Sequence, residues 1–424
     1  MRRLFLTLIC YFMLNALQAK PQPIVLWHSM AGNLGTAFQT ITNEFNHIQS
    51  AYVIKPIYKG DYIESLTSFA AAFRAHQPPD LIQVFEVGTA TMLAPRGIIK
   101  PVDEIMQAEG LSLPKADMFP AVLAAYSNGG QLMAMPFNTS VPSLFYNADA
   151  LAKVGYTAQN FPRTWDELEV LAARLKHEGF ACVYTSAYPA WILIESFSAT
   201  HGLGLIDPNT KRAIFNNKKI VHHLQRLVRW QGLHYFEYGG RTDDATVLFS
   251  SGRCPLLSQS SGAYNSLTEL VPFHVGMAPL PMEDKSPGIR FNNVAGGAAL
   301  WAVAGQSASV YRGMALFFTY LASPKVQQRW HEATGYLPLG SVGVYQKLAD
   351  ESQNPALGLA AQEFMGNTGE IVPLQLGPFN QIRAINDEAL EAIFAGIKGP
   401  QQAMDEAVQR ANHALLRFSH NTHS

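Results

Sequence analysis

The N-terminal part of the chain alternates apolar strand segments with amphipathic helices, and this order constrains the fold more than any other feature. Residues 23–27, 52–58 and 80–87 are rich in the apolar, β-branched and aromatic residues typical of strands. Between them, apolar side chains recur at helical spacing over residues 34–45 and 66–73. A β-α-β-α-β order predicts an α/β fold with a largely parallel sheet, covered by helices on both faces.

Three segments of interest lie at the carboxyl ends of these strands, at residues 27–29, 60–62 and 86–88. Ligands of such sheets gather outside the carboxyl ends of the strands, where loops and helix N-termini meet. Tyr62 and Glu86 are therefore predicted at one edge of a ligand cleft.

A second α/β unit is predicted to begin near residue 136. It contains strand-like segments over residues 141–147 and 181–185. A later strand is predicted over residues 298–303, and two helices over residues 385–418 form the tail. A chain of 424 residues normally divides into two or more lobes.

The N-terminus has the pattern of an export signal. Arg2 and Arg3 precede an apolar stretch over residues 4–17, which is too short to span a bilayer. A small residue, Ala19, provides a cleavage position. Residues 1–19 are therefore predicted to be a signal peptide, and Cys10 lies too early for lipid attachment. We expect a soluble protein exported to the periplasm.

Loss of Arg2 and Arg3 would change the formal net charge from −1 to −3. The sequence also contains no basic stripe, which argues against a nucleic-acid-binding protein. The mature chain would keep Cys182 and Cys254, which either pair in an oxidising compartment or remain two buried thiols, and the second interpretation is slightly favoured.

Motifs for catalysis are mostly absent from the sequence. It contains no G-x-S-x-G elbow, no Walker loop, no G-x-G-x-x-G and no H-E-x-x-H, because Gly335 stands where His331-Glu332 would need a second histidine. We expect no catalytic residue, metal or cofactor, and a binding protein rather than an enzyme.

Four polar segments remain as candidates for binding an anion, and each has a plainer alternative. Ser140 lies in an Asn-Thr-Ser turn, and Ser260 lies in a serine-rich loop that could equally cap a helix. Gly297 follows another glycine, where backbone approaches a ligand or simply enters a strand. Arg383 offers a fork for two phosphate oxygens, although a lone arginine is more often a surface residue.

A helix with both ends marked is predicted over residues 324–334, with Ser323 before it and Gly335 after it. Tyr336 follows Gly335 directly and precedes a Leu-Pro turn. With Tyr62, Tyr188 and Trp191, this tyrosine is a candidate for packing against a polyol or sugar, although each of the four is as easily a core residue.

These segments together resemble the extracytoplasmic solute-binding proteins of ABC importers, and in particular the glycerol-3-phosphate-binding members of Ugp-type importers. The resemblance covers nearly the whole chain after the predicted signal. The matching segments are L-W-H-S-M from Leu26, Y-K-G-D-Y from Tyr58, Q-V-F-E-V-G-T-A-T-M from Gln83, P-F-N-T-S from Pro136, T-W-D-E-L from Thr164, G-G-A-A-L-W from Gly296, W-H-E-A-T-G-Y-L-P from Trp330 and Q-I-R from Gln381.

The resemblance implies a two-lobed, type II periplasmic-binding-protein fold with the ligand cleft between the lobes. One lobe would comprise residues 24–135 and 286–335, and the other residues 136–285 and 336–424. It also implies which residues contact the ligand: Tyr62, Glu86, Ser140, Tyr188, Trp191, Ser260, Gly297, Tyr336 and Arg383. Tyr188 stands where the family has a second cleft tryptophan, which leaves the ligand preference open.

The resemblance further implies a monomer that binds sn-glycerol 3-phosphate, with glycerophosphocholine as a second candidate ligand, and docks on inner-membrane permease subunits. We expect the phosphate at Arg383, Ser140, Ser260 and Gly297, and the glycerol at Glu86, because a carboxylate repels phosphate. Two rival functions are an oligosaccharide-binding protein of the same class and a periplasmic phosphodiester hydrolase.

Overall fold

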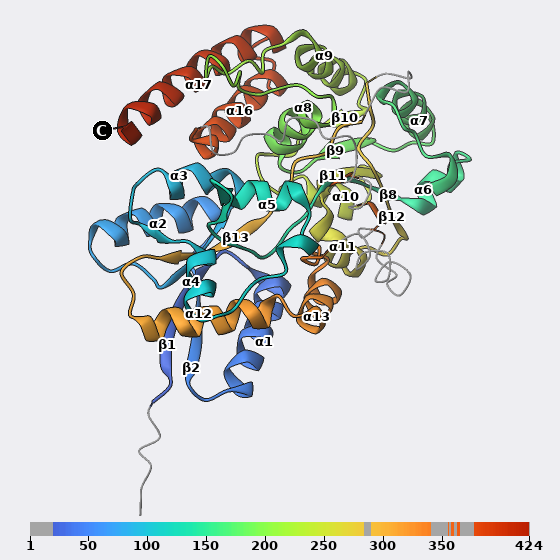
Figure 1. Ribbon diagram of the computed structural model, residues 1–424. Coiled ribbons are helices and arrows are strands. Elements are labelled where there is room, and N and C mark those ends of the chain that lie inside the picture. Colours follow the sequence, from blue (N-terminus) through green and yellow to red (C-terminus); the bar gives the residue numbers. More distant parts are fainter. Residues whose placement is uncertain are drawn as a thin grey trace, which may run out of the picture.

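The computed structural model describes residues 20–283, 290–340, 355, 358–359, 363–364 and 377–423. The predicted signal peptide, residues 1–19, lies outside the described residues. Figure 1 shows two groups of strands, each with its own helices, and the tail helices α16 and α17 lying along the top of the molecule.

The first sheet has the strand order β2-β1-β3-β13-β4, with β7 paired to β13. Its strands are β1 (Gln22–His28), β2 (Tyr52–Tyr58), β3 (Leu81–Phe85), β4 (Ile99–Lys100), β7 (Met135–Pro136) and β13 (Ala298–Val303). The pairs β1–β2 and β1–β3 are parallel, as the alternating pattern predicts, whereas β13 runs antiparallel to β3. The strand predicted over residues 80–87 is shorter because Glu86 already starts a helical turn, η1 (Glu86–Gly88).

Helix α12 packs against β1, α1 packs against β2 and α13, and α2 packs against β3. The helices are α1 (Gly32–Ile48), α2 (Tyr62–Arg74), α3 (Thr89–Leu93), α4 (Val102–Ala108), η2 (Lys115–Asp117), α5 (Pro120–Tyr126), α12 (Ala308–Leu321) and α13 (Pro324–Thr334), and a hairpin of β5 (Ser127–Asn128) and β6 (Gln131–Leu132) follows α5. Helix α13 ends at Gly335, whose φ of 83° is easily reached only by glycine.

The second sheet has the order β10-β9-β11-β8-β12. Its strands are β8 (Pro142–Asn147), β9 (Tyr184–Ser186), β10 (Phe236–Glu237), β11 (Leu256–Ser260) and β12 (Val275–Ala278). Its helices are α6 (Ala148–Lys153), η3 (Ala158–Asn160), α7 (Trp165–His177), η4 (Ala190–Ser196), α8 (Phe197–Thr200), α9 (Lys218–Gly232), α10 (Thr246–Ser250), η5 (Ser261–Ala263), α11 (Tyr264–Leu270), α16 (Phe379–Phe394) and α17 (Pro400–His423). Thr164 and Glu167 form a capping box at the start of α7.

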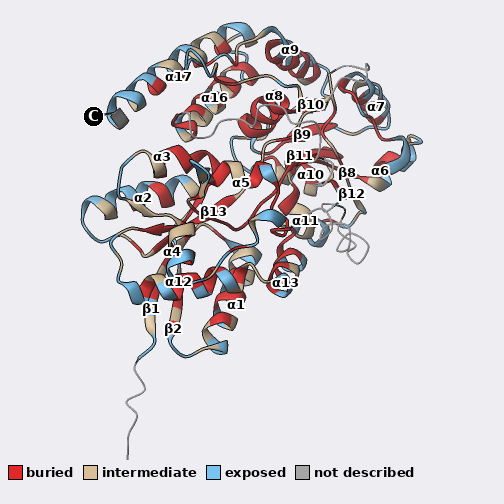
Figure 2. Ribbon diagram, in the orientation of Figure 1, coloured by how far each residue is buried: buried red, intermediate tan, exposed pale blue. Residues whose placement is uncertain are grey.

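The segments that pass from one sheet to the other lie side by side. Ser140 and Gly296 exchange two backbone hydrogen bonds, with N–O distances of 3.1 and 2.9 Å. The Leu337 amide donates to the Thr139 carbonyl at 2.8 Å. Figure 2 shows the strands of both sheets largely buried, with exposed residues on the outer helices. Among the described residues, no helix combines the length and the apolar character that crossing a bilayer requires.

Cys182 and Cys254 form a disulfide, with 4.7 Å between their Cα atoms, so our slight preference for two free thiols was wrong. Strands β9 and β11 are parallel neighbours that pair Tyr184 with Leu256. Each cysteine stands two residues before its member of this pair, so the sheet register brings the two sulfur atoms together. Their separation of 72 residues gave no such information from the sequence.

We expect the double variant Cys182→Ser/Cys254→Ser to lose about 3–4 kcal/mol of unfolding free energy, because the disulfide closes a long loop in the unfolded chain. Urea unfolding of both proteins measures the loss. Adding a reductant should shift the unfolding midpoint of the wild type but not that of the double variant. Equal midpoints for the two oxidised proteins would contradict a stabilising role.

Candidate functional site

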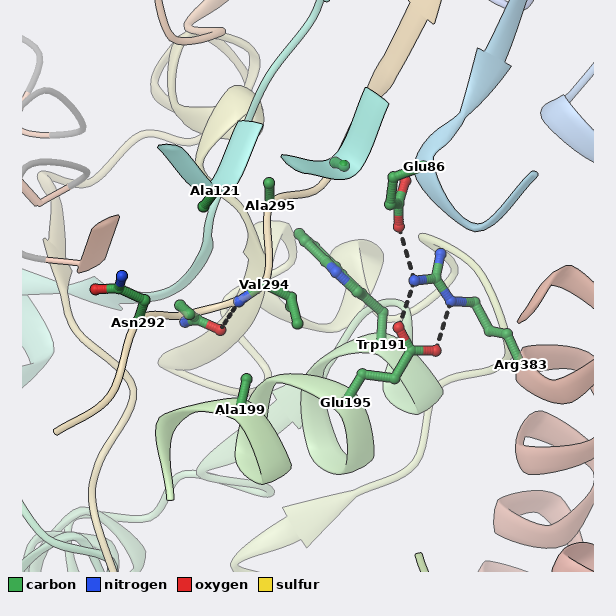
Figure 3. A pocket seen from close by; sticks show the side chains of 11 residues that line it. Glu86, Ala121, Trp191, Glu195, Ala199, Asn292, Val294, Ala295 and Arg383 are labelled. Carbon is green, nitrogen blue, oxygen red and sulfur yellow. Dashed lines mark hydrogen bonds and ion pairs between the residues drawn. The ribbon is translucent and has the colours of Figure 1, made fainter. Parts of the chain in front are cut away.

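A cavity lies where elements of the two sheets meet, and Figure 3 shows it from close by. Its volume is about 20 Å³, which accommodates one or two water molecules. The lining residues come from η1, α5, η4, α8, the segment before β13 and α16: Glu86, Ala121, Ala125, Trp191, Glu195, Ala199, Asn292, Asn293, Val294, Ala295 and Arg383.

Arg383, on α16, is the cation that lines this cavity. Its side chain is 16% exposed and is therefore not the surface residue of the plainer interpretation. Its Nε and Nη2 donate to the two carboxylate oxygens of Glu195 at 2.8 and 2.5 Å, and Nη2 also donates to Glu86 Oε1 at 2.7 Å. Burial opposes the charge of Arg383, but Glu195 and Glu86 outweigh it and raise the pKa of the guanidinium above its ordinary value.

Glu86 begins η1, directly after β3, and is 3% exposed. Burial raises the pKa of its carboxyl, and the charge of Arg383 partly offsets this rise. Its amide donates to the Gly297 carbonyl at 3.0 Å, which fixes the start of η1 against the segment that enters β13. The carboxylate is therefore held at the carboxyl end of β3, where the sequence predicted it.

The structure joins Arg383 and Glu86 by a hydrogen bond, and the predicted ligand orientation, with phosphate at Arg383 and glycerol at Glu86, stays a prediction. It also adds Glu195, which sequence reasoning missed. Glu195 is 2% exposed and lies in the apolar run of η4. A lone acidic residue within such a run needs a buried partner, and that was the available signal.

Trp191 lies in the first turn of η4 and Tyr188 lies two residues before this helix, and of the two only Trp191 lines the cavity. The Trp191 Nε1 atom is buried and has no hydrogen-bond partner among the described residues. Tyr188 adopts a φ of 44°, is 37% exposed and stands 6.5 Å from the Trp191 ring, measured between ring centroids. Although the residue is partly exposed, the protein around its hydroxyl desolvates that group and raises its pKa, and the nearby Asp243 adds to the rise.

Tyr62 and Tyr336 meet at Asn138, at the crossing between the sheets. Asn138 Nδ2 donates to the Tyr62 hydroxyl at 2.9 Å, and its Oδ1 accepts from Gln83 Nε2 at 2.9 Å. Burial raises the pKa of the Tyr336 hydroxyl, and hydrogen bonding with Asn138 and Tyr62 opposes this rise. The Tyr336 ring is stacked on Trp330 with 6.1 Å between centroids. The pair of tyrosines predicted at the cleft is therefore brought together.

The remaining predicted residues have clear backbone or capping roles. Ser260 Oγ accepts from the Gly262 amide at 3.2 Å, so this serine caps η5, as the plainer interpretation held. Ser140 is buried in the crossing. Gly297 has a φ of 99°, and an added Cβ would lie 1.7 Å from the Asn138 carbonyl oxygen, which makes it a tight entry to β13. Contact of these three residues with a ligand stays a prediction.

Side chains of the metal-binding types gather at one place in the described part of the chain, at Cys182, Glu237 and Cys254. Both sulfur atoms there belong to the disulfide and are not available as thiolate ligands. The cavity lining instead combines the guanidinium of Arg383 with the carboxylates of Glu86 and Glu195, which can hydrogen-bond a polar organic ligand.

Asp387, one helical turn after Arg383, predicts a measurable pH dependence. Burial raises its carboxyl pKa from 3.8 to about 7, although Arg383 and the Ala190 amide oppose the rise. The folded state then holds the proton more tightly than the unfolded state, so the free energy of unfolding falls as pH rises from about 4 to about 7.

We expect Asp387→Asn to flatten this dependence and to be more stable than the wild type at about pH 8. Asparagine keeps an oxygen for the Ala190 amide, which donates to Asp387 Oδ1 at 3.3 Å. Urea unfolding across this pH range measures both effects. An unchanged slope between about pH 4 and 7 would show that another group titrates there.

The fold and the cavity define a class of protein, and comparison with known families agrees. The family described as "Bacterial extracellular solute-binding protein" matches residues 40–357. The chain belongs to this family, which binds solutes and does not catalyse reactions. Within it, the chain is 35% identical over 98% of its length to the sn-glycerol-3-phosphate-binding periplasmic protein UgpB of Pectobacterium atrosepticum, of which the match covers 96%. It is 36% identical over 96% of its length to UgpB of an Escherichia coli strain, covering 97% of that protein.

Solved structures agree on the two-lobed solute-binding fold. UgpB from Mycobacterium tuberculosis in complex with glycerophosphocholine matches 94% of this chain and 99% of its own, with a TM-score of 0.78 and 20% identity. The GacH receptor of Streptomyces glaucescens, solved unliganded and in complex with acarbose, matches 93% of this chain and 98% of its own, also with a TM-score of 0.78, at 18% identity. At these identities the likeness concerns the fold alone.

Proposed function

We propose that this chain is the solute-binding subunit of an ABC importer that captures sn-glycerol 3-phosphate in the periplasm and delivers it to a membrane permease. The observation that carries the proposal is the buried guanidinium of Arg383 in the cavity, in a chain 35–36% identical over nearly its full length to proteins named for binding this ligand. A guanidinium fork can donate to two oxygens of one phosphate.

Ligand entry requires the two lobes to separate. The cavity holds about 20 Å³, which is too small for glycerol 3-phosphate. We propose lobes of residues 24–135 with 286–335 and 136–285 with 336–424, rotating about the crossing where Thr139 pairs with Leu337. The mature chain, after removal of residues 1–19, would act as a monomer, and the closed, loaded form would dock on the permease.

Glycerophosphocholine is the second candidate ligand. The cavity lining holds Arg383 against Glu86 and Glu195, so its carboxylates outnumber its cation. Such a lining tolerates a phosphodiester, which has one negative charge, better than a phosphate monoester, which is mostly dianionic at neutral pH. Tyr188, beside Trp191, would contact the choline group of this phosphodiester.

Calorimetric titration of the purified mature chain tests the proposal. We expect saturable one-to-one binding of glycerol 3-phosphate or glycerophosphocholine and no binding of maltose. Binding of maltose or maltotriose alone would favour the oligosaccharide-binding alternative. Release of choline from glycerophosphocholine by metal-free protein would instead revive the hydrolase alternative.

A further inference from the structure

Glu195 holds the guanidinium of Arg383 from one side. Its two carboxylate oxygens accept from Nε at 2.8 Å and from Nη2 at 2.5 Å. Figure 3 shows this side-on pair at the edge of the cavity, next to Trp191. Both Glu195 and Trp191 come from η4, a helix of the π type, and such turns are frequent at functional sites.

This contact decides which donors of Arg383 remain for a ligand. Nε and one N–H of Nη2 point to Glu195, and the other N–H of Nη2 serves Glu86. Nη1 makes no hydrogen bond to the described residues. The Nη1–Nη2 edge is therefore the one from which a phosphate can displace Glu86, while Glu195 keeps the guanidinium in place.

Glu195 also changes the charge that a ligand meets. Because Arg383 is paired with Glu195, it presents oriented N–H donors to a ligand, but the pair as a whole carries little net charge. The electrostatic penalty from a nearby carboxylate grows with the negative charge of the ligand, so it is larger for a dianion than for a monoanion.

We propose that Glu195 is a positioning residue that aims the Nη1–Nη2 edge of Arg383 at the ligand phosphate, and that its charge lowers the preference for phosphate dianions relative to phosphodiester monoanions. This inference rests on the proposed function, and it assigns the selectivity of the site to a residue outside the predicted contact set.

Other titratable groups face this pair and must be kept constant. They are Glu86 from η1, Tyr126 from α5 and Asp387 from α16, each of which interacts electrostatically with Arg383 or Glu195. Since burial raises the pKa of Asp387 to about 7, absolute affinities change with pH for reasons unrelated to Glu195. Comparing two ligands at one pH removes most of this contribution.

The test is a calorimetric titration of wild type and Glu195→Gln with glycerol 3-phosphate and glycerophosphocholine. At about pH 8, where the monoester is a dianion, the affinity ratio of glycerol 3-phosphate to glycerophosphocholine should rise about tenfold in the variant. At about pH 5, where both phosphates carry one negative charge, the ratio should equal that of the wild type. A loss of structure alone would weaken both ligands at both pH values.

Matched variants complete the experiment. Glu391→Gln removes the same charge from the exposed end of α16, where Glu391 pairs with Arg241, and should leave the ratio unchanged. Glu195→Asp keeps the charge but shortens the side chain, so both affinities should fall with the ratio preserved. A wild-type ratio for Glu195→Gln at about pH 8, or an equal change at about pH 5, overturns the inference. Wild-type protein that binds neither ligand overturns the proposed function instead.

Discussion

Replacing Arg383 with alanine should weaken binding of glycerol 3-phosphate at least about 100-fold, because the variant loses two charge-assisted hydrogen bonds worth about 1.5–3 kcal/mol each. Isothermal calorimetry measures the loss. The change also leaves the buried carboxylates of Glu86 and Glu195 without their partner, and breaking a buried pair in this way costs about 3–5 kcal/mol of stability. Affinity must therefore be measured on protein shown to be folded by circular dichroism.

Arg383→Lys separates the two effects. Lysine keeps the positive charge beside Glu86 and Glu195 but lacks the planar fork, so stability should change less while affinity still falls about tenfold or more. Arg241→Ala is the matched control, because Arg241 is exposed and pairs with Glu391 away from the cavity. A folded Arg383 variant with wild-type affinity would remove Arg383 from the binding site.

Replacing Gly297 with alanine should destabilise the protein by about 3 kcal/mol or more, from backbone strain together with a steric clash. The residue has a φ of 99°, and the new Cβ would lie 1.7 Å from the Asn138 carbonyl oxygen. The displaced backbone would also move Glu86, whose amide donates to the Gly297 carbonyl. Urea unfolding should therefore show lower stability, and calorimetry should show weaker ligand binding.

Gly305, just after the other end of β13, provides the control. It also has a positive φ, 86°, but an added Cβ would meet no atom within 4 Å. Gly305→Ala should therefore cost only about 1 kcal/mol and leave binding unchanged. Similar losses of unfolding free energy for the two variants would show that the positive φ alone, rather than the close approach to Asn138, requires glycine at position 297.

Several strands, and the positions of Tyr62 and Glu86 after two of them, were predictable because their signals are local. Strand β2 matches its predicted bounds, and Glu86 and Tyr62 lie at strand ends where an α/β sheet places ligands. Gly335 ends α13 as its position in the sequence indicated. These features depend on spacing and turn chemistry within a few residues, which a single sequence contains.

The features that were missed depend on contacts between distant segments. The Cys182–Cys254 disulfide follows from the register of β9 and β11, which the sequence does not reveal. The pairing of Arg383 with Glu86 and Glu195 joins residues separated by 297 and 188 positions. Ser260 caps η5, and its contact with a ligand stays a prediction, because a serine that caps a helix and one that binds an anion have the same sequence pattern.

A crystal structure of the mature chain grown with glycerol 3-phosphate tests the central claim most directly. We predict phosphate oxygens within hydrogen-bond distance of Arg383 Nη1 and Nη2, Glu86 released from Arg383 and accepting from a glycerol hydroxyl, and Glu195 still bonded to Nε. A ligand bound elsewhere, with Arg383 still joined to both Glu86 and Glu195, would contradict the account.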